Sequence, residues 1–102
     1  MSREYDIYVP TMRNDGGPVG EAVMGQIKTS LTNAFGGHTE LKYRCKGEWK
    51  VGGVSFRDEV TIIRVVDDGT ATLDIVEFKH NLKAVLQQDE VLIVRREVTL
   101  VE

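Results

Sequence analysis

The sequence predicts one α+β domain with ferredoxin-like βαββαβ topology, in which a four-stranded antiparallel sheet carries two helices on one face. The length of 102 residues fits a single domain spanning positions 1–102. Polar and apolar side chains alternate from His38 to Val51, as in a strand with one wet and one buried face. A Gly52-Gly53 pair and a second strand-like run complete a hairpin. A strand-like and a helical segment precede this hairpin, and a helical and a strand-like segment follow it.

The segments before the hairpin are a strand, a loop and a helix. Residues 5–10 are β-prone and end at a proline, and residues 11–20 are rich in turn-forming types. Apolar residues recur at spacings of three and four over residues 21–35, which predicts a helix with one apolar stripe. The Gly36-Gly37 pair then supplies the left-handed conformation that commonly ends a helix.

The two hairpin strands are predicted at residues 38–51 and 54–66. In the first strand the odd positions are apolar and should face the core, while the even positions are charged and solvated. Cys45 shares the odd face, which indicates a small buried group rather than a reactive thiol. The second strand is apolar at even positions and also at Ile63 and Val65. Apolarity on both faces is typical of a central strand.

The last two elements are a helix and a strand. Asp67-Asp68-Gly69-Thr70 closes the hairpin, and Thr70 or Thr72 is the candidate N-cap of the second helix. The final strand begins at residues 91–94, and Arg95-Arg96-Glu97 interrupts its pattern, which predicts a bulge or bend. In this order strands one and three are central, and right-handed crossovers place both helices on one face.

The composition argues against several classes of function. A net charge of −3 lacks the basic footprint of nucleic-acid binding, so we expect no nucleic-acid partner. No apolar run approaches the roughly 18 residues of a membrane span. The first residues are polar, and we therefore expect a cytoplasmic protein with no membrane partner. His38 and His80 are isolated from one another, which predicts no metal site, and no cofactor is expected.

Proteins that share this topology suggest two further alternatives. Metal-dependent nucleases of this type would use a first-strand aspartate, for which Asp6 is the candidate. RNA-recognition domains stack bases on aromatic residues of the central strands, where Tyr5 and Tyr8 lie. Phe56 is the aromatic residue of the third strand, and its parity assigns it to the core face.

Two candidate sites follow from the predicted arrangement. Ile63 and Val65 would lie on the sheet face that the helices leave open, where they are either covered by Arg and Lys stems or form a homo-oligomer interface. A ligand-binding site would form if the first loop meets the start of strand two, and its residues would be Arg13, Asp15, His38, Thr39 and Trp49. Trp49 is either a core aromatic or a pocket residue. A loss of roughly 3–5 kcal/mol in Trp49→Ala would indicate the core.

Three segments resemble the pattern elements YVP, FGG-x-T and G-x-W of an uncharacterised family of bacterial proteins of about this length. They are Tyr8-Val9-Pro10, Phe35-Gly36-Gly37-His38-Thr39 and Gly47-Glu48-Trp49, which are read together with the Asp15-Gly16 loop. The resemblance covers most of the chain and implies no established activity, so no catalytic residue follows from it. We expect a non-enzymatic, homo-oligomeric binding or regulatory module, most simply a homodimer. The alternative is a small enzyme or ligand-binding domain that uses the second candidate site.

Overall fold

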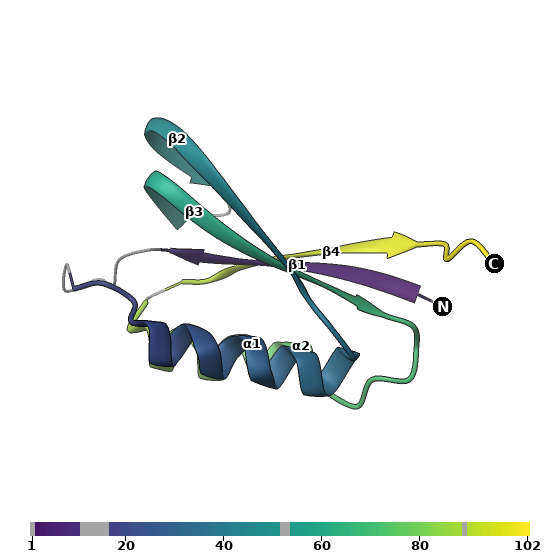
Figure 1. Ribbon diagram of the computed structural model, residues 1–102. Coiled ribbons are helices and arrows are strands. Elements are labelled where there is room, and N and C mark those ends of the chain that lie inside the picture. The colour runs from purple at the N-terminus through teal and green to yellow at the C-terminus, as the bar shows by residue number, and fades with distance from the viewer. Residues whose placement is uncertain (1, 11–16, 52–53, 89) are drawn as a thin grey trace.

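The chain folds in the predicted order of elements. The computed structural model describes residues 2–10, 17–51, 54–88 and 90–102, without the side chains of residues 45–49, 51, 54, 55, 57 and 58. These residues form β1 (Ser2–Pro10), α1 (Glu21–Phe35), β2 (Thr39–Val51), β3 (Val54–Asp67), α2 (Ile75–Leu86) and β4 (Leu92–Val98). The strands form one antiparallel sheet in the order β2-β3-β1-β4, and both helices lie on the same face (Figure 1). The ferredoxin-like α+β fold and the central positions of β1 and β3 are therefore confirmed.

Helix α1 has the bounds that its apolar spacing predicts. Ile27 and Leu31, one turn apart, are buried against the sheet. Gly36 ends the helix with φ 84°, a left-handed conformation that glycine adopts without strain. Its N–H donates to the carbonyl oxygen of Thr32 at 2.8 Å, so one of the last carbonyls of the helix is satisfied.

The main core lies between the helices and the sheet. Odd-numbered residues of β1 and β3 meet the apolar stripes of both helices there; the buried members are Tyr5, Ile7, Val9, Ile27, Leu31, Ile63, Val65, Leu82, Leu86 and Val91. Ile63 and Val65 are 0% and 1% exposed, so their assignment to an open sheet face and to a homo-oligomer interface is wrong. The alternation indicated which residues of β3 share a face. It could not indicate which face the helices cover, because both faces are apolar.

A second cluster occupies the opposite face of the sheet. Phe56, Val60 and Ile62 are buried there, packed by partly buried side chains of Tyr8, Leu41 and Leu92. The predicted pairing of the odd face of strand two with the even face of strand three is correct, since Leu41 faces Ile62 and Tyr43 faces Val60. These residues nevertheless point away from the helices, so the expectation that this face packs against them is wrong.

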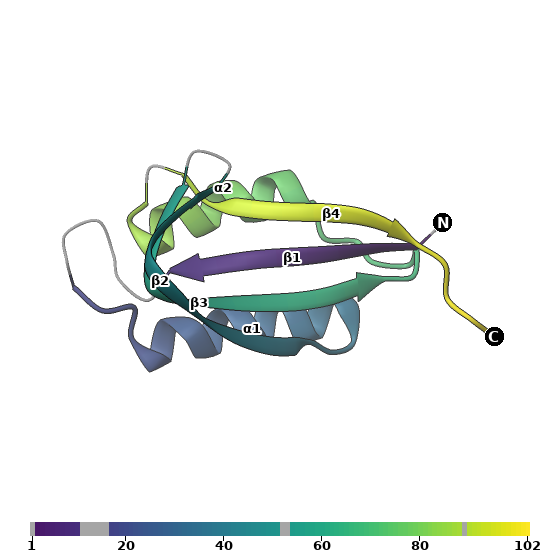
Figure 2. The ribbon, with the colours of Figure 1, turned by 90° about the horizontal axis from the view of Figure 1, so that it is seen from above.

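The β2–β3 hairpin curves over that second cluster. The two strands bend away from the helices, and the hairpin crosses above β1 toward β4 (Figures 1 and 2). The register changes between the pairs Arg44↔Glu59 and Glu48↔Arg57, where β2 carries extra residues. Such a bulge bends a strand and increases its twist. The alternating pattern did not predict this bulge, and Gly47 was its only signal. Pairing continues to Val51↔Val54, and the Gly52-Gly53 turn lies outside the described residues.

Two predictions about the second half of the chain are wrong. Asp74, not Thr70 or Thr72, caps α2, and its carboxylate accepts from the N–H groups of Val76 and Glu77 at 3.0 and 3.3 Å. Thr70 instead belongs to a turn closed by Asp68. No bulge interrupts β4 either, because residues 92–98 pair with residues 2–8 of β1 in one continuous register. Its charged residues fit because β4 is an edge strand.

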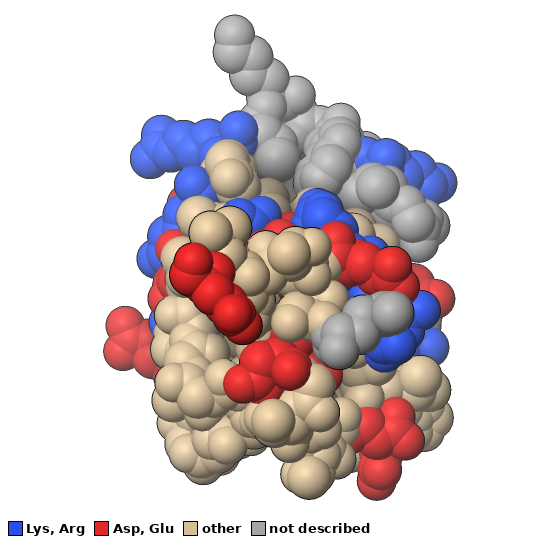
Figure 3. All heavy atoms as spheres, turned by 90° about the vertical axis from the view of Figure 1, so that its right-hand side faces the viewer, with Lys and Arg blue, Asp and Glu red and all other residues tan. Residues whose placement is uncertain are grey.

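Charged side chains of both signs lie on the end of the molecule where the termini lie (Figure 3). On this face the described basic side chains lie mostly in the upper half of the view and the acidic ones mostly in the middle and lower part (Figure 3). The expected absence of a nucleic-acid partner stays a prediction. Neither described helix has the length and apolar character needed to cross a bilayer.

The buried position of Ile63 can be tested by denaturation. Ile63→Ala should reduce the free energy of unfolding by about 2–5 kcal/mol, because it removes a fully buried side chain. Val66→Ala is the matched control, since Val66 lies on the same strand and is 38% exposed. Urea titrations followed by circular dichroism measure both. Equal losses in the two variants would contradict the assignment of Ile63 to the core.

Candidate functional site

The ligand site predicted from the sequence is only partly described. His38 and Thr39 are exposed just after the C-terminal end of α1, and a hydrogen bond of 2.8 Å joins His38 Nδ1 to Thr32 Oγ1. Pro10 and Val19, which flank the first loop, lie at the other end of this helix beside Glu21. A helix of 15 residues spans about 22 Å. The described members of the set therefore do not lie beside the borders of the loop. Arg13 and Asp15, and the side chain of Trp49, lie outside the described residues, so their roles stay predictions.

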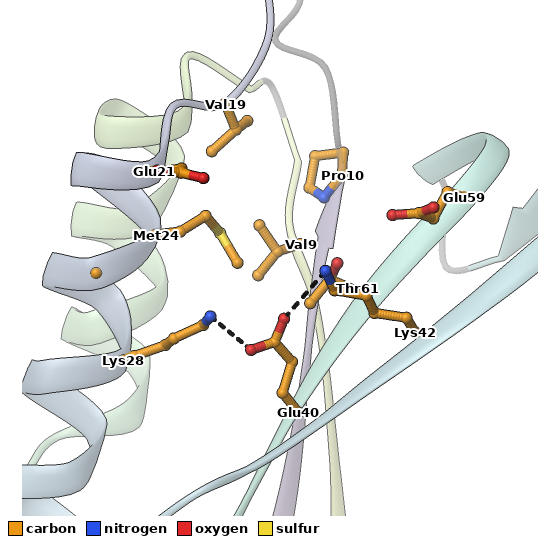
Figure 4. Close-up of a pocket in the computed structure, with 11 residues that line it drawn as sticks. Val9, Pro10, Val19, Glu21, Met24, Lys28, Glu40, Lys42, Glu59 and Thr61 are labelled. Atoms are coloured by element: carbon orange, nitrogen blue, oxygen red, sulfur yellow. Dashed lines mark ion pairs between the residues drawn. The ribbon is translucent and has the colours of Figure 1, made fainter.

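A groove is present at the N-terminal half of α1 instead (Figure 4). It lies between α1 and the β2–β3 hairpin and has a volume of about 380 Å³. Its lining residues come from β1, from α1 and the segment before it, and from β2 and β3. They are Val9, Pro10, Val19, Glu21, Met24, Gly25, Lys28, Glu40, Lys42, Glu59 and Thr61. We call this hollow the α1 groove.

The floor of the α1 groove is an ionic bridge between α1 and the edge strand β2. The carboxylate of Glu40 lies 2.5 Å from Lys28 Nζ and 3.7 Å from Lys42 Nζ (Figure 4). The hydrogen bond from Lys28 holds the pKa of Glu40 below its usual value, against a smaller opposing effect of burial. Glu40 and Lys42 belong to the face of strand two that was predicted to be solvated. Lys42 is exposed, but Glu40 is half-buried because it joins β2 to α1.

The upper part of the α1 groove is apolar between two carboxylates. Met24 and Val9 point into the space, and Glu21 and Glu59 lie on opposite sides of it (Figure 4). Neither glutamate forms an ion pair with another described residue. Gly25 also lines the groove, and a Cβ added there would meet no atom within 4 Å. The helix therefore leaves free space at a position where packing does not require a glycine.

A second polar cluster lies on the opposite face of the sheet. Asp6 is 1% exposed, and its carboxylate accepts from Arg64 Nε at 2.8 Å, from Arg64 Nη2 at 3.1 Å and from Arg96 Nη1 at 2.9 Å. Glu4 lies 3.4 Å from both arginines. Burial by itself raises the pKa of Asp6, but the hydrogen bonds and charges of the two arginines outweigh it and hold that pKa below its usual value.

This cluster does not have the chemistry of a metal site. Two guanidinium groups occupy the oxygens of Asp6 and would repel a divalent cation, so the structure contradicts the nuclease alternative based on this residue. The shallow hollow above it has a volume of about 330 Å³ and is lined by the same arginines. Asp6 and Glu4 balance the charges of Arg64 and Arg96, so the described residues of this hollow offer no unpaired charge to a ligand. We therefore favour the α1 groove as the candidate site.

The sequence contained only weak signals for the α1 groove. A glycine inside a helical pattern costs stability relative to alanine. Gly25 could therefore have indicated a position with a functional or packing role. Lys28 belongs to a helical pattern and Glu40 to a strand pattern, and neither pattern indicates that the two residues meet. Only the packing of α1 beside β2 brings them together.

No protein-family model, curated protein or solved structure matches the chain. The resemblance to the family with YVP, FGG-x-T and G-x-W elements therefore stays a prediction, and the candidate site rests on its own geometry.

Removal of the Asp6 carboxylate should destabilise the fold and change its acid sensitivity. The folded pKa of Asp6 lies below the unfolded value of about 3.9, so ionised Asp6 stabilises the protein at neutral pH. This contribution is lost as the pH falls from the unfolded pKa through the folded one. We expect Asp6→Asn to cost about 2 kcal/mol at neutral pH. This is less than for a fully buried pair, because both guanidinium groups are partly exposed and can be rehydrated.

Urea denaturation at neutral and acidic pH measures both effects. In Asp6→Asn the decline of stability below about pH 4 should be shallower than in the wild type. Glu4→Gln is the control, because its longer contacts with the arginines predict a smaller loss. A variant with wild-type stability at neutral pH would show that the cluster does not stabilise the sheet.

Proposed function

We propose that the protein is a homo-oligomeric binding module whose α1 groove takes up a small amphipathic cation, such as a short alkylamine. The observation that carries the proposal is the pair of carboxylates, Glu21 and Glu59, on either side of an apolar space that contains Met24 and Val9. An ammonium group would lie between the carboxylates, and its alkyl chain would contact the apolar side chains.

The charges that line the groove support a cation rather than an anion. Lys28 and Lys42 both lie close to the carboxylate of Glu40, at 2.5 and 3.7 Å, so each positive charge of the floor faces an acidic group. Three glutamates and two lysines line the groove, which leaves a formal charge of 2 − 3 = −1. The N-terminal end of α1 adds partial positive charge, and Glu21 in the first turn compensates it. The preference for a cation therefore depends mainly on Glu59.

The size of the groove supports a small ligand. Its volume of about 380 Å³ lies near the lower end of the range for small-molecule sites, about 300–1,000 Å³. The groove is a different site from the one that the sequence-based alternative expected, although Pro10 and Val19 at the borders of the first loop contribute to its lining. Strand β2 contributes Glu40 and Lys42 to the groove, and His38 and Thr39 are not part of its lining.

The homo-oligomeric part of the proposal is supported by the surface near the C-terminus. Leu100 and Val101 are 47% and 96% exposed, and they follow the edge strand β4 directly. Exposed apolar residues beside an unpaired strand edge are typical of an association surface. Ile63 and Val65 have no part in this surface because they are buried in the core.

Butylamine and butyrate are matched probes for the α1 groove, because they have similar apolar bodies and opposite charges. In a methyl NMR titration we expect butylamine to shift the signals of Val9, Val19 and Met24, and butyrate to shift them less. Glu59→Gln should weaken butylamine binding by about fivefold, the effect of losing one exposed ion pair. Glu77→Gln on α2 is the charge-matched control. Equal responses to the two probes, or no response to either, would reject the proposal.

Gly25→Ala provides a second test, because stability and binding should change in opposite directions. The added methyl group meets no atom, so the variant should gain about 1 kcal/mol of stability from higher helix propensity. It also narrows the groove and should weaken butylamine binding. Gly36→Ala is the matched control and should lose about 1 kcal/mol, because its φ of 84° strains any other residue. Tighter butylamine binding by Gly25→Ala would contradict this placement of the ligand.

A further inference from the structure

One edge of the sheet ends in a strand that has a single described neighbour. β4 pairs with β1 on one side only, and β1 is followed by the central strand β3 (Figure 2). The chain continues beyond β4 as Thr99-Leu100-Val101-Glu102, a β-prone segment that belongs to no described strand. Leu100 is 47% exposed and Val101 is 96% exposed. The edge and its continuation thus present backbone donors and acceptors together with apolar side chains.

A hollow lies directly beneath this edge on the helix side of the sheet. It has a volume of about 390 Å³ and is lined by Ile75, Val76, Ile93 and Arg95, among others. Val76 is 73% exposed there, although it is an apolar residue in the first turn of α2. A strand added beside β4 would place its helix-side residues next to this hollow and would cover part of Val76. The exposed apolar residues near this edge are thus Val76 of α2 on the helix side and Leu100 and Val101 in the C-terminal segment.

Symmetry limits how two copies of β4 can pair. In a symmetric antiparallel pair the two-fold axis is perpendicular to the sheet, so one residue faces its own copy and all others pair about it. With Arg96 at the axis, Arg95 faces the partner's Glu97 and Val94 faces the partner's Val98. The same register continues with Leu92 opposite the partner's Leu100, and with Ile93 opposite the partner's Thr99. It therefore pairs opposite charges on the helix side and apolar residues on the other side.

The neighbouring symmetric registers lack this complementarity. With Arg95 at the axis, Ile93 would face the partner's Glu97, and Val94 would face the partner's Arg96. With Glu97 at the axis, Arg96 would face the partner's Val98, and the two Glu97 residues would face each other. Placing Arg96 at the axis brings two arginines together, but each of them is already bound to Asp6 and Glu4 of its own chain. The repulsion between them is correspondingly reduced.

We infer that the protein forms a two-fold dimer through antiparallel pairing of β4 with the β4 of a second copy, centred at Arg96 and extended by residues 99–101. The pairing produces one continuous eight-stranded sheet with all four helices on the same face. This inference rests on the homo-oligomer of the proposed function and names its surface and register. The α1 groove lies on the other side of each β4–β1 pair and stays open.

Charge reversal at one cross-strand pair tests the register. Sedimentation velocity over a range of concentrations up to the high micromolar gives the dissociation constant of the dimer. Arg95→Glu and Glu97→Arg each place like charges opposite one another twice per dimer, and each should weaken dimerisation by about tenfold or more. The double variant Arg95→Glu/Glu97→Arg restores opposite charges and should recover most of the loss. Both side chains are exposed, so the monomer should keep its fold, which circular dichroism checks.

Hydrogen exchange supplies a second readout that does not depend on charge. In residues 99–101 the alternate amides that point to the partner strand should become protected as the wild-type concentration rises, and this protection should be absent in Arg95→Glu. A dimer that neither reversal weakens, or that the double variant fails to restore, overturns the β4 register and leaves the homo-oligomer intact. A wild type that stays monomeric overturns both the β4 register and the homo-oligomer. The β4 edge would then be open to pairing with a strand of a different protein. Butylamine binding in the α1 groove is independent of every one of these outcomes.

Discussion

Strand β3 buries side chains on both faces of the sheet, and the rest of the architecture follows from that double burial. Ile63 and Val65 require cover on one face, which the two helices supply. Val60 and Phe56 require cover on the other, where no helix is described. The bend of the long hairpin meets this second requirement, because it turns the outer parts of β2 and β3 over their own apolar residues (Figure 1). A ferredoxin-like sheet with an otherwise open face thus acquires a partial second layer from its own strands.

The buried carboxylate of Asp6 connects strands β1, β3 and β4. It lies on β1 and binds Arg64 of β3 and Arg96 of β4, so it links both neighbours of the central strand. A buried ion cluster contributes modest net stability, since desolvation offsets much of the attraction between the charges. Its larger effect is on register, because a shift of one residue in either strand would send an arginine to the opposite face and leave a buried charge without a partner. The same cluster binds the charge of Arg96, the residue at the centre of the inferred dimer axis.

The two proposed interactions use opposite sides of the molecule and different physical features. The α1 groove depends on a gap between a helix and an edge strand, with the Lys28–Glu40 pair closing its floor. The dimer depends on the free hydrogen-bonding groups of β4 and on complementary side chains along it. Neither the ligand nor the partner strand has to displace a described ion pair. Binding at the groove and association at the edge can therefore occur together, and two ligands can bind per dimer.

The sequence by itself determined the order of the elements, the bounds of α1, the central position of β3 and the pairing of the hairpin faces. These follow from short-range periodicity, since a side chain on a strand or helix has its direction set by its immediate neighbours along the chain. Only the tertiary structure decided which face of the sheet the helices cover, where β2 bulges and which distant charges meet. Ile63 and Val65 show the reason. Their strand is apolar on both faces, so its own pattern is equally compatible with either face, and the choice depends on how the whole chain packs. The contacts of Asp6 and Glu40 could not be predicted from the sequence either, because their partners come from strands and a helix that only folding brings together.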